Sequence, residues 1–185
     1  IERAIKKGTG EIEGASYEEA CYEGFGAGGI ALIVEIITDN KNRSFADLRT
    51  LFNKNNGNLG EPGSVSHMFD RKGEIKLSEA SSNEEEVISL AIEAGAEDVV
   101  NDEKLFYVIT ATDELSNVAN TISESGADIE SQKLIFVPKT TATISDPSIA
   151  RQVLRLFAAV DDYDDTQSVY GNFDISEQLM ETLEI

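Results

Sequence analysis

An internal repeat between residues 74 and 138 constrains the fold more than any other feature of the sequence. Each half predicts a strand, a helix, a Gly-Ala-acid junction and a second strand. The two junctions begin at Gly95 and Gly126, which are 31 residues apart. Glycine after a helix is common, but the helix lengths and flanking strands match as well. Two such units in tandem predict a βαββαβ, ferredoxin-like domain.

The residues before the repeat predict the first part of another domain. Strands are expected at 17–25, 30–38 and 64–70, and a helix at 44–55. The strand at 30–38 is nearly all apolar, which is typical of a central strand. The apolar stripe expected on the helix consists of Phe45, Leu48, Leu51 and Phe52.

The tail after residue 138 contains only one good strand, near Val169 and Tyr170, between two helices. Because one strand cannot form a sheet, we expect the tail to return to the sheet begun by residues 17–70. The predicted fold class is therefore α+β with two α/β-sandwich domains: a ferredoxin-like βαββαβ domain inserted into a discontinuous mixed α/β domain. The expected boundaries are 15–72 with 139–185 for the outer domain and 73–138 for the insertion.

Residues 1–14 predict the end of a helix followed by a Gly-rich linker. Apolar residues at positions 1, 4 and 5 share a helical face, and Lys6 and Lys7 suit the dipole at a helix C terminus before Gly8. So few residues do not hold a helix in water. We therefore expect further sequence before Ile1.

The charge of the chain is distributed unevenly along the sequence. The net charge is −20, of which residues 1–72 carry −2 and residues 73–185 carry −18. The acidic part should repel nucleic acid and anionic membranes, and it is a candidate surface for a protein partner. Any polyanion contact is expected within the first 72 residues or in sequence attached before residue 1. With no membrane-length apolar run and no secretory signal, the sequence favours a cytosolic protein.

The sequence offers no set of residues for catalysis, metal binding or cofactor binding. One cysteine, Cys21, and one histidine, His67, exclude an internal disulfide and the usual Cys/His zinc sites. The glycines at 24–29 are followed by a strand, so they favour a hairpin connection over a nucleotide loop, which needs a helix. We predict that the chain is not an enzyme and needs neither a metal nor a cofactor.

The candidate binding residues are cations and amides of the first 72 residues. Lys41 and Arg43 flank an expected helix N terminus, where exposed N–H groups favour phosphate. The amide-rich loop at 53–60 is either a compact loop or a polar contact loop. The cations form either a solvated mixed-charge face or a phosphate-contact surface. The candidate nucleic-acid contacts are Lys6, Lys7, Lys41, Arg43, Arg49, Lys54, Asn56, Asn58, Arg71 and Lys72.

Several ordered sequence blocks cover essentially the whole chain and together indicate a family. They are IERAIKKGTG at 1–10, YEGFGAGG at 22–29, TDNKNR at 38–43, GNLG at 57–60, GSV at 63–65, FDRKG at 69–73 and AIEAGAEDV at 91–99. In these blocks the chain resembles the YebC/PmpR family of bacterial regulatory proteins. One departure is Ala27, where the family usually has proline in its Gly-rich turn.

The resemblance implies a fold and a function. Members have a discontinuous α/β domain with an inserted α/β domain, preceded by a basic helical domain whose expected sequence does not occur in this chain. They are described as DNA-binding transcriptional regulators, and mitochondrial relatives as translational activators. We therefore predict a cytoplasmic DNA-binding transcriptional regulator, with most affinity supplied by that basic domain. The alternative is a ribosome-associated translation factor whose loop at 53–60 and Lys41–Arg43 edge contact rRNA.

Overall fold

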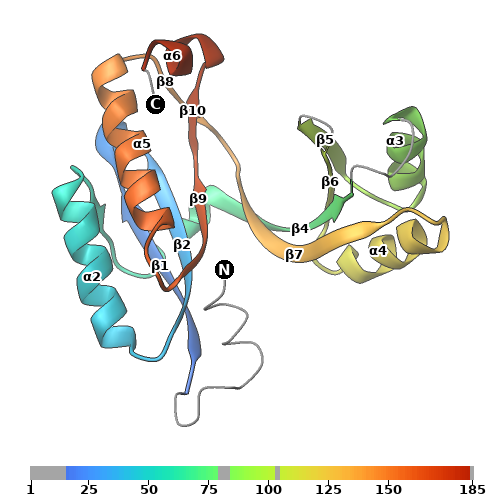
Figure 1. Ribbon diagram of the computed structural model, residues 1–185, viewed down its shortest axis with the longest axis horizontal. Helices are drawn as coiled ribbons and strands as arrows, with labels where there is room; N and C mark the ends of the chain where they lie inside the picture. The colour runs from blue at the N-terminus through green and yellow to red at the C-terminus, as the bar shows by residue number, and fades with distance from the viewer. Residues whose placement is uncertain (1–15, 79–83, 103–104, 184–185) are drawn as a thin grey trace. The chain divides into compact units, whose positions relative to one another are not determined.

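The structure is a computed structural model that describes residues 16–78, 84–102 and 105–183 (Figure 1). The chain divides into two compact units. The first comprises Ile1–Met68 with Thr140–Ile185, and the second comprises Phe69–Lys139. The second unit thus begins at Phe69, whereas the sequence placed the boundary after residue 72. Among the described residues, no helix has the length and apolarity needed to cross a membrane.

The first unit is built on a four-stranded sheet whose order is β3-β1-β2-β9 and whose neighbouring strands are antiparallel. β2 is central and nearly all apolar, as expected for a strand that is covered on both sides. β9 comes from the tail, which confirms that the tail returns to this sheet. The strands are β1 (Glu18–Phe25), β2 (Ala31–Thr38), β3 (Asn58–Leu59) and β9 (Thr166–Gly171).

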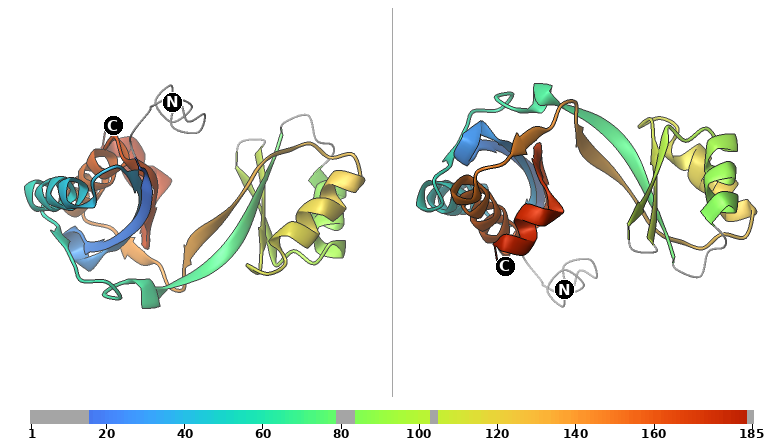
Figure 2. Two further views of the ribbon diagram at one scale, coloured as in Figure 1. Left: turned by 90° about the horizontal axis from the view of Figure 1, so that it is seen from below. Right: turned by 90° about the horizontal axis from the view of Figure 1, so that it is seen from above.

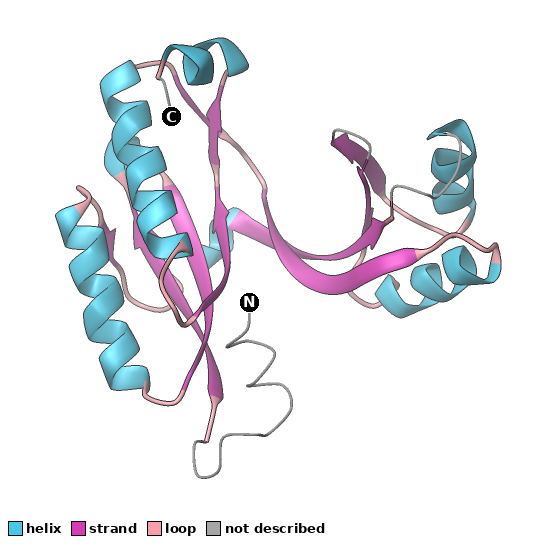
Figure 3. Cartoon of the chain, in the orientation of Figure 1, coloured by secondary structure: helices cyan, strands magenta, loops and turns pink. Residues whose placement is uncertain are grey.

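Two helices, α2 (Lys41–Lys54) and α5 (Pro147–Asp161), pack on one face of this sheet (Figure 3). Each begins at a side-chain cap. The Asn40 side chain accepts a hydrogen bond from the Arg43 N–H, and Asp146 accepts from the N–H of Ser148. Burial of each large apolar side chain stabilises the fold by about 1.5–3 kcal/mol. The fully buried residues of this core include Leu32, Val34, Leu48, Phe52, Val153, Leu156 and Val160.

The remaining elements of the first unit are short. A 3-10 turn at Ala27–Gly29 joins β1 to β2, so the Gly-rich segment is a hairpin connection. In the tail, β8 (Ala142–Ile144) and β10 (Phe173–Ile175) form a two-stranded parallel sheet that the sequence did not predict. The last helix is α6 (Glu177–Thr182).

The second unit has the predicted βαββαβ order of elements (Figure 2). Its sheet has the strand order β5-β6-β4-β7, all pairs are antiparallel, and both helices contribute to one core on one face. This arrangement confirms the ferredoxin-like fold. The elements are β4 (Phe69–Leu77), α3 (Glu84–Glu93), β5 (Asp98–Asp102), β6 (Leu105–Thr110), α4 (Leu115–Glu124) and β7 (Ile129–Pro138).

The two repeated glycines end the two helices of the second unit in the same way. Gly95 has φ 98° and Gly126 has φ 91°, a left-handed conformation that glycine adopts without a steric penalty. Gly95 donates to the carbonyl of Ile92, and Gly126 donates to the carbonyl of Ser123. The 31-residue spacing therefore separates two helix C termini that have the same conformation.

The strand predicted at 64–70 is wrong. Residues Ser66–Met68 form a 3-10 turn, and one long strand, β4, begins only at Phe69. The physical cause is Glu23 of β1, whose carboxylate accepts hydrogen bonds from the N–H groups of Gly63, Val65 and Ser66 at 2.7–2.8 Å. These bonds occupy the N–H groups that a strand would donate to a neighbour.

Candidate nucleic-acid interface

Helix α2 carries a positive charge that is unusual for this chain. It contains four Lys/Arg and one Asp, whereas the whole chain has a net charge of −20. Ser44, Leu48 and Phe52 form its buried ridge. The next ridge, at four-residue intervals, is exposed and consists of Lys41, Phe45, Arg49 and Asn53.

Phe45 was predicted in the apolar stripe of α2, and that prediction is wrong. Its side chain is 42% exposed, although its ring lies 5.9 Å from the ring of Tyr22. The Tyr22 hydroxyl donates to the backbone carbonyl of Lys41 at 3.3 Å. Burial raises the pKa of Tyr22 above its ordinary value. The exposed ring of Phe45 therefore packs against Tyr22 of β1.

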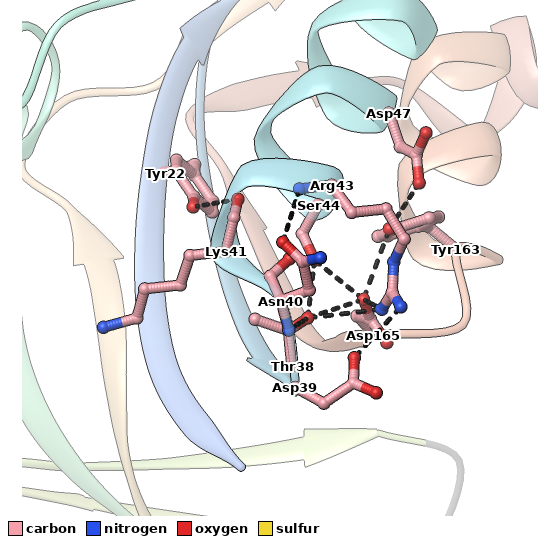
Figure 4. Close-up of polar contacts among 10 residues, drawn as sticks. All are labelled: Tyr22, Thr38, Asp39, Asn40, Lys41, Arg43, Ser44, Asp47, Tyr163 and Asp165. Atoms are coloured by element: carbon pink, nitrogen blue, oxygen red, sulfur yellow. Dashed lines mark hydrogen bonds and ion pairs between the residues drawn. The ribbon is translucent and has the colours of Figure 1, made fainter. Parts of the chain in front are cut away.

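A cluster of hydrogen-bonded polar side chains connects the N terminus of α2 to the start of β9 (Figure 4). Its centre is the Asp165 carboxylate, whose side chain is 8% exposed. Asp165 Oδ2 lies 2.7 Å from Arg43 Nη2, 2.8 Å from Ser44 Oγ and 3.0 Å from Thr38 Oγ1. We call these four residues, Thr38, Arg43, Ser44 and Asp165, the Asp165 cluster.

The charges of the Asp165 cluster compensate each other. Burial alone would raise the pKa of Asp165, but hydrogen bonds from Arg43, Ser44 and Thr38 outweigh it and lower this pKa. The hydrogen bond to Asp165 raises the pKa of Arg43, and Arg43 Nη1 also lies 3.0 Å from Asp39 Oδ1. Arg43, a predicted phosphate contact, thus already has two carboxylate partners.

The other predicted cations of α2 lie on different sides of the helix. Lys41 is exposed, and its Nζ lies 3.6 Å from Glu18 Oε2. Arg49 is on the same ridge, and within the described part of the chain it forms no ion pair. The helical period places Lys54 on the opposite side, with Arg43 and Asp47. The structure therefore places Lys41 and Arg49 on one ridge of α2, on either side of Phe45.

The amide-rich segment after α2 is a compact loop. Asn56 has φ 58°, and its side chain donates to Gln152 Oε1 at 2.9 Å. A Cβ atom at Gly57 would lie 2.6 Å from the Phe25 carbonyl oxygen, so the backbone approaches β1 closely there. Asn58 is exposed in β3, which pairs with the end of β1. Of these two predicted contacts, Asn56 thus bonds to α5, and Asn58 is exposed next to the C-terminal end of α2.

The remaining predicted contacts lie elsewhere. Arg71 and Lys72 belong to β4 in the second unit. The Arg71 guanidinium lies 4.1 Å from the centroid of the Phe136 ring, and Lys72 Nζ lies 2.6 Å from Glu97 Oε2. Lys6 and Lys7 lie outside the described residues.

The two units of the structure have the same net charge. The first unit has nine Lys/Arg and nineteen Asp/Glu, and the second has six and sixteen, so each has a net charge of −10. The uneven distribution along the sequence therefore does not separate a neutral unit from an acidic one. Within the acidic first unit, α2 nevertheless has four Lys/Arg against one Asp. Among the residues that the structure describes, no group of three or more His, Cys, Asp or Glu could hold a metal ion.

Sequence reasoning missed Phe45 and Tyr22 as candidate contacts. The signal was present in the four-residue spacing of Lys41, Phe45 and Arg49, which places an aromatic residue between two cations on one ridge. That spacing was assigned to the core because Phe45 is apolar.

Comparisons with known proteins identify the family. Residues 17–173 match the family model described as "TACO1/YebC second and third domain". The chain is 49% identical over 183 residues to the "Probable transcriptional regulatory protein DP2908" of Desulfotalea psychrophila, covering 99% of this chain and 73% of the relative. It is also 49% identical to a "Probable transcriptional regulatory protein" of Persephonella marina, covering 98% of this chain and 73% of that relative.

A solved structure agrees with these sequence matches. The crystal structure of the conserved hypothetical protein Aq1575 from Aquifex aeolicus matches with a TM-score of 0.86 and 43% identity, over 95% of this chain and 72% of that protein. The predicted resemblance is confirmed: this chain belongs to the TACO1/YebC family.

Proposed function

We propose that this chain acts as a cytoplasmic, non-enzymatic regulator of gene expression that binds nucleic acid. The observation that carries the proposal is the exposed ridge of α2, where Lys41 and Arg49 present positive charge on a chain with a net charge of −20. The names of the relatives, probable transcriptional regulatory proteins, support the same role. The leading candidate is DNA-binding transcriptional regulation. The relatives are longer than this chain, and we propose that their additional residues provide much of the affinity.

The second candidate is a ribosome-associated translation factor or translational activator. It is favoured by Phe45, because an exposed aromatic side chain beside cations is typical of proteins that stack on unpaired RNA bases. In either case, the acidic second unit is available for a protein partner.

The test is crosslinking of the protein in cells, followed by sequencing of the bound nucleic acid and sedimentation with ribosomes. Enrichment of promoter DNA supports transcriptional regulation. Enrichment of rRNA with cosedimentation supports the translation factor. Recovery of neither above an uncrosslinked sample contradicts the proposed function.

A further inference from the structure

A groove of about 290 Å³ lies beside α2 in the first unit. Its lining includes Tyr22 and Phe45, Arg49 from the exposed ridge of α2, Leu59 from the amide-rich loop and Pro62 just after that loop. The groove thus combines aromatic surface, aliphatic surface, one guanidinium and the carboxylates of Glu23 and Glu61. Such a composition suits a flat, planar ligand that carries negative charge at its edge.

The aromatic wall of the groove is held in place. The Phe45 ring packs at a 48° tilt against Tyr22, and the Tyr22 hydroxyl is tied to the Lys41 carbonyl. The other wall is also fixed, because Gly60 donates to the Glu23 carbonyl at 2.8 Å and the Glu23 carboxylate holds residues 63–66. A wall ordered before binding loses little conformational freedom when a ligand stacks on it.

Two cations of α2 flank Phe45 on its exposed ridge and can contact an anionic ligand. Lys41 and Arg49 lie four residues before and after Phe45, which is about 6 Å along the helix axis in each direction. The exposed Lys41–Glu18 pair at 3.6 Å contributes little and is easily replaced. Two acids also line the groove: the Glu23 carboxylate is satisfied by three N–H groups, and Glu61 is exposed.

We propose that this groove binds an unpaired base of a single-stranded nucleic acid, stacked on Phe45, with Lys41 and Arg49 contacting the phosphates on either side. The inference rests on the proposed function, since it names the part of the nucleic acid that the first unit recognises. A base in a duplex is stacked between its neighbours and does not reach Phe45, so the groove discriminates unpaired from paired strands.

The experiment measures binding of this chain to fluorescently labelled oligouridine and oligothymidine by anisotropy at low salt. Oligouridine annealed to oligoadenine is the paired competitor. Phe45→Ala should weaken binding of the unpaired strands by about 5- to 150-fold, the effect of losing one stacked base. Phe45→Leu should weaken it similarly because the aromatic face is lost, and Phe45→Tyr should retain it. Arg49→Ala should weaken binding and reduce the salt slope by about 0.7.

Matched controls come from exposed residues on other helices. Ile92→Ala removes an apolar side chain that is 64% exposed on α3, and Arg151→Ala removes an exposed arginine from α5. Each should change the affinity by less than about 2-fold, as for surface substitutions away from a site. Thermal melting of every variant shows whether a loss of binding reflects unfolding. Phe45→Leu and Phe45→Tyr both keep a large side chain at this exposed position, so they separate loss of the aromatic face from loss of bulk.

Three results of the binding experiment overturn the inference: no binding of unpaired strands, equal binding of the duplex, or equal affinity of Phe45→Leu and Phe45→Tyr. A groove that instead joins two copies of the chain would appear as a dimer in analytical ultracentrifugation that Phe45→Ala dissociates, which also overturns it. In-cell crosslinking separates this failure from that of the proposed function. If wild-type and Phe45→Ala protein recover the same nucleic acid, the groove is irrelevant but the regulator binds nucleic acid.

Discussion

Arg43 and Asp165, which are 122 residues apart in the sequence, are joined by a hydrogen bond of 2.7 Å between Nη2 and Oδ2. The bond connects the first turn of α2 to the residue before β9, and so ties the two sequence halves of the first unit. Thr38 and Ser44 complete the Asp165 cluster from β2 and α2. Arg43, one of the cations that the sequence assigned to phosphate binding, therefore has a structural partner.

Asp165→Ala should destabilise the chain by about 2 kcal/mol, because hydrogen bonds to a charged acceptor are lost and buried donors remain unsatisfied. Urea denaturation followed by circular dichroism measures the change. The control is Asp162→Ala, an exposed aspartate at the end of α5, which should shift the unfolding free energy by less than about 0.5 kcal/mol. Equal effects would show that the Asp165 cluster does not hold the two halves together.

The stability of the chain should fall as the pH decreases below the ordinary pKa of a glutamate, about 4.3. Burial tends to raise the pKa of Glu23, but hydrogen bonds from Gly63, Val65 and Ser66 outweigh it and lower this pKa. The pKa of Asp165 is lowered as well. A lowered carboxyl pKa stabilises the fold above the unfolded pKa, and this stabilisation is lost as the pH falls through the folded pKa.

Glu23→Gln isolates this effect. The variant should be less stable at pH 7 and should lose less stability between pH 5 and 3, because an amide does not titrate and presents donors to the N–H groups of the loop. Glu19→Gln, on the same strand and exposed, should keep the wild-type pH dependence. A Glu23→Gln profile parallel to that of the wild type would contradict the assignment.

Local patterns predicted the elements better than they predicted the partners of side chains. The repeat around Gly95 and Gly126 was visible because helix ends leave a mark within a few residues. The bonds of Glu23 to a loop 40–43 residues away, and of Arg43 to Asp165, have no local signature. Hydrophobic periodicity placed Phe45 in the core. Periodicity shows which apolar residues share one side of a helix, but it does not show how far around the helix the buried face extends.

Residues 69–139 should fold when they are produced alone. They contain all four strands of one sheet, in the order β5-β6-β4-β7, and a core of their own that includes Ile75, Val108 and Ile122. Residues 16–68 alone should not fold, because β2 would lose β9 and the core would lose α5. Thermal unfolding followed by circular dichroism tests both. Absence of a cooperative transition in 69–139 would contradict the independence of the insertion.

Lys41→Glu should weaken nucleic-acid binding without unfolding the chain, whereas Arg43→Glu should lower the melting temperature. Lys41 makes one exposed ion pair at 3.6 Å, but a glutamate at position 43 would face the buried carboxylate of Asp165. The matched control is Lys133→Glu in the second unit, since Lys133 is also exposed and lies 3.6 Å from Glu74. Anisotropy with oligouridine and thermal melting are measured for all three. If Lys133→Glu weakens binding as much as Lys41→Glu, net charge governs affinity and the ridge of α2 does not.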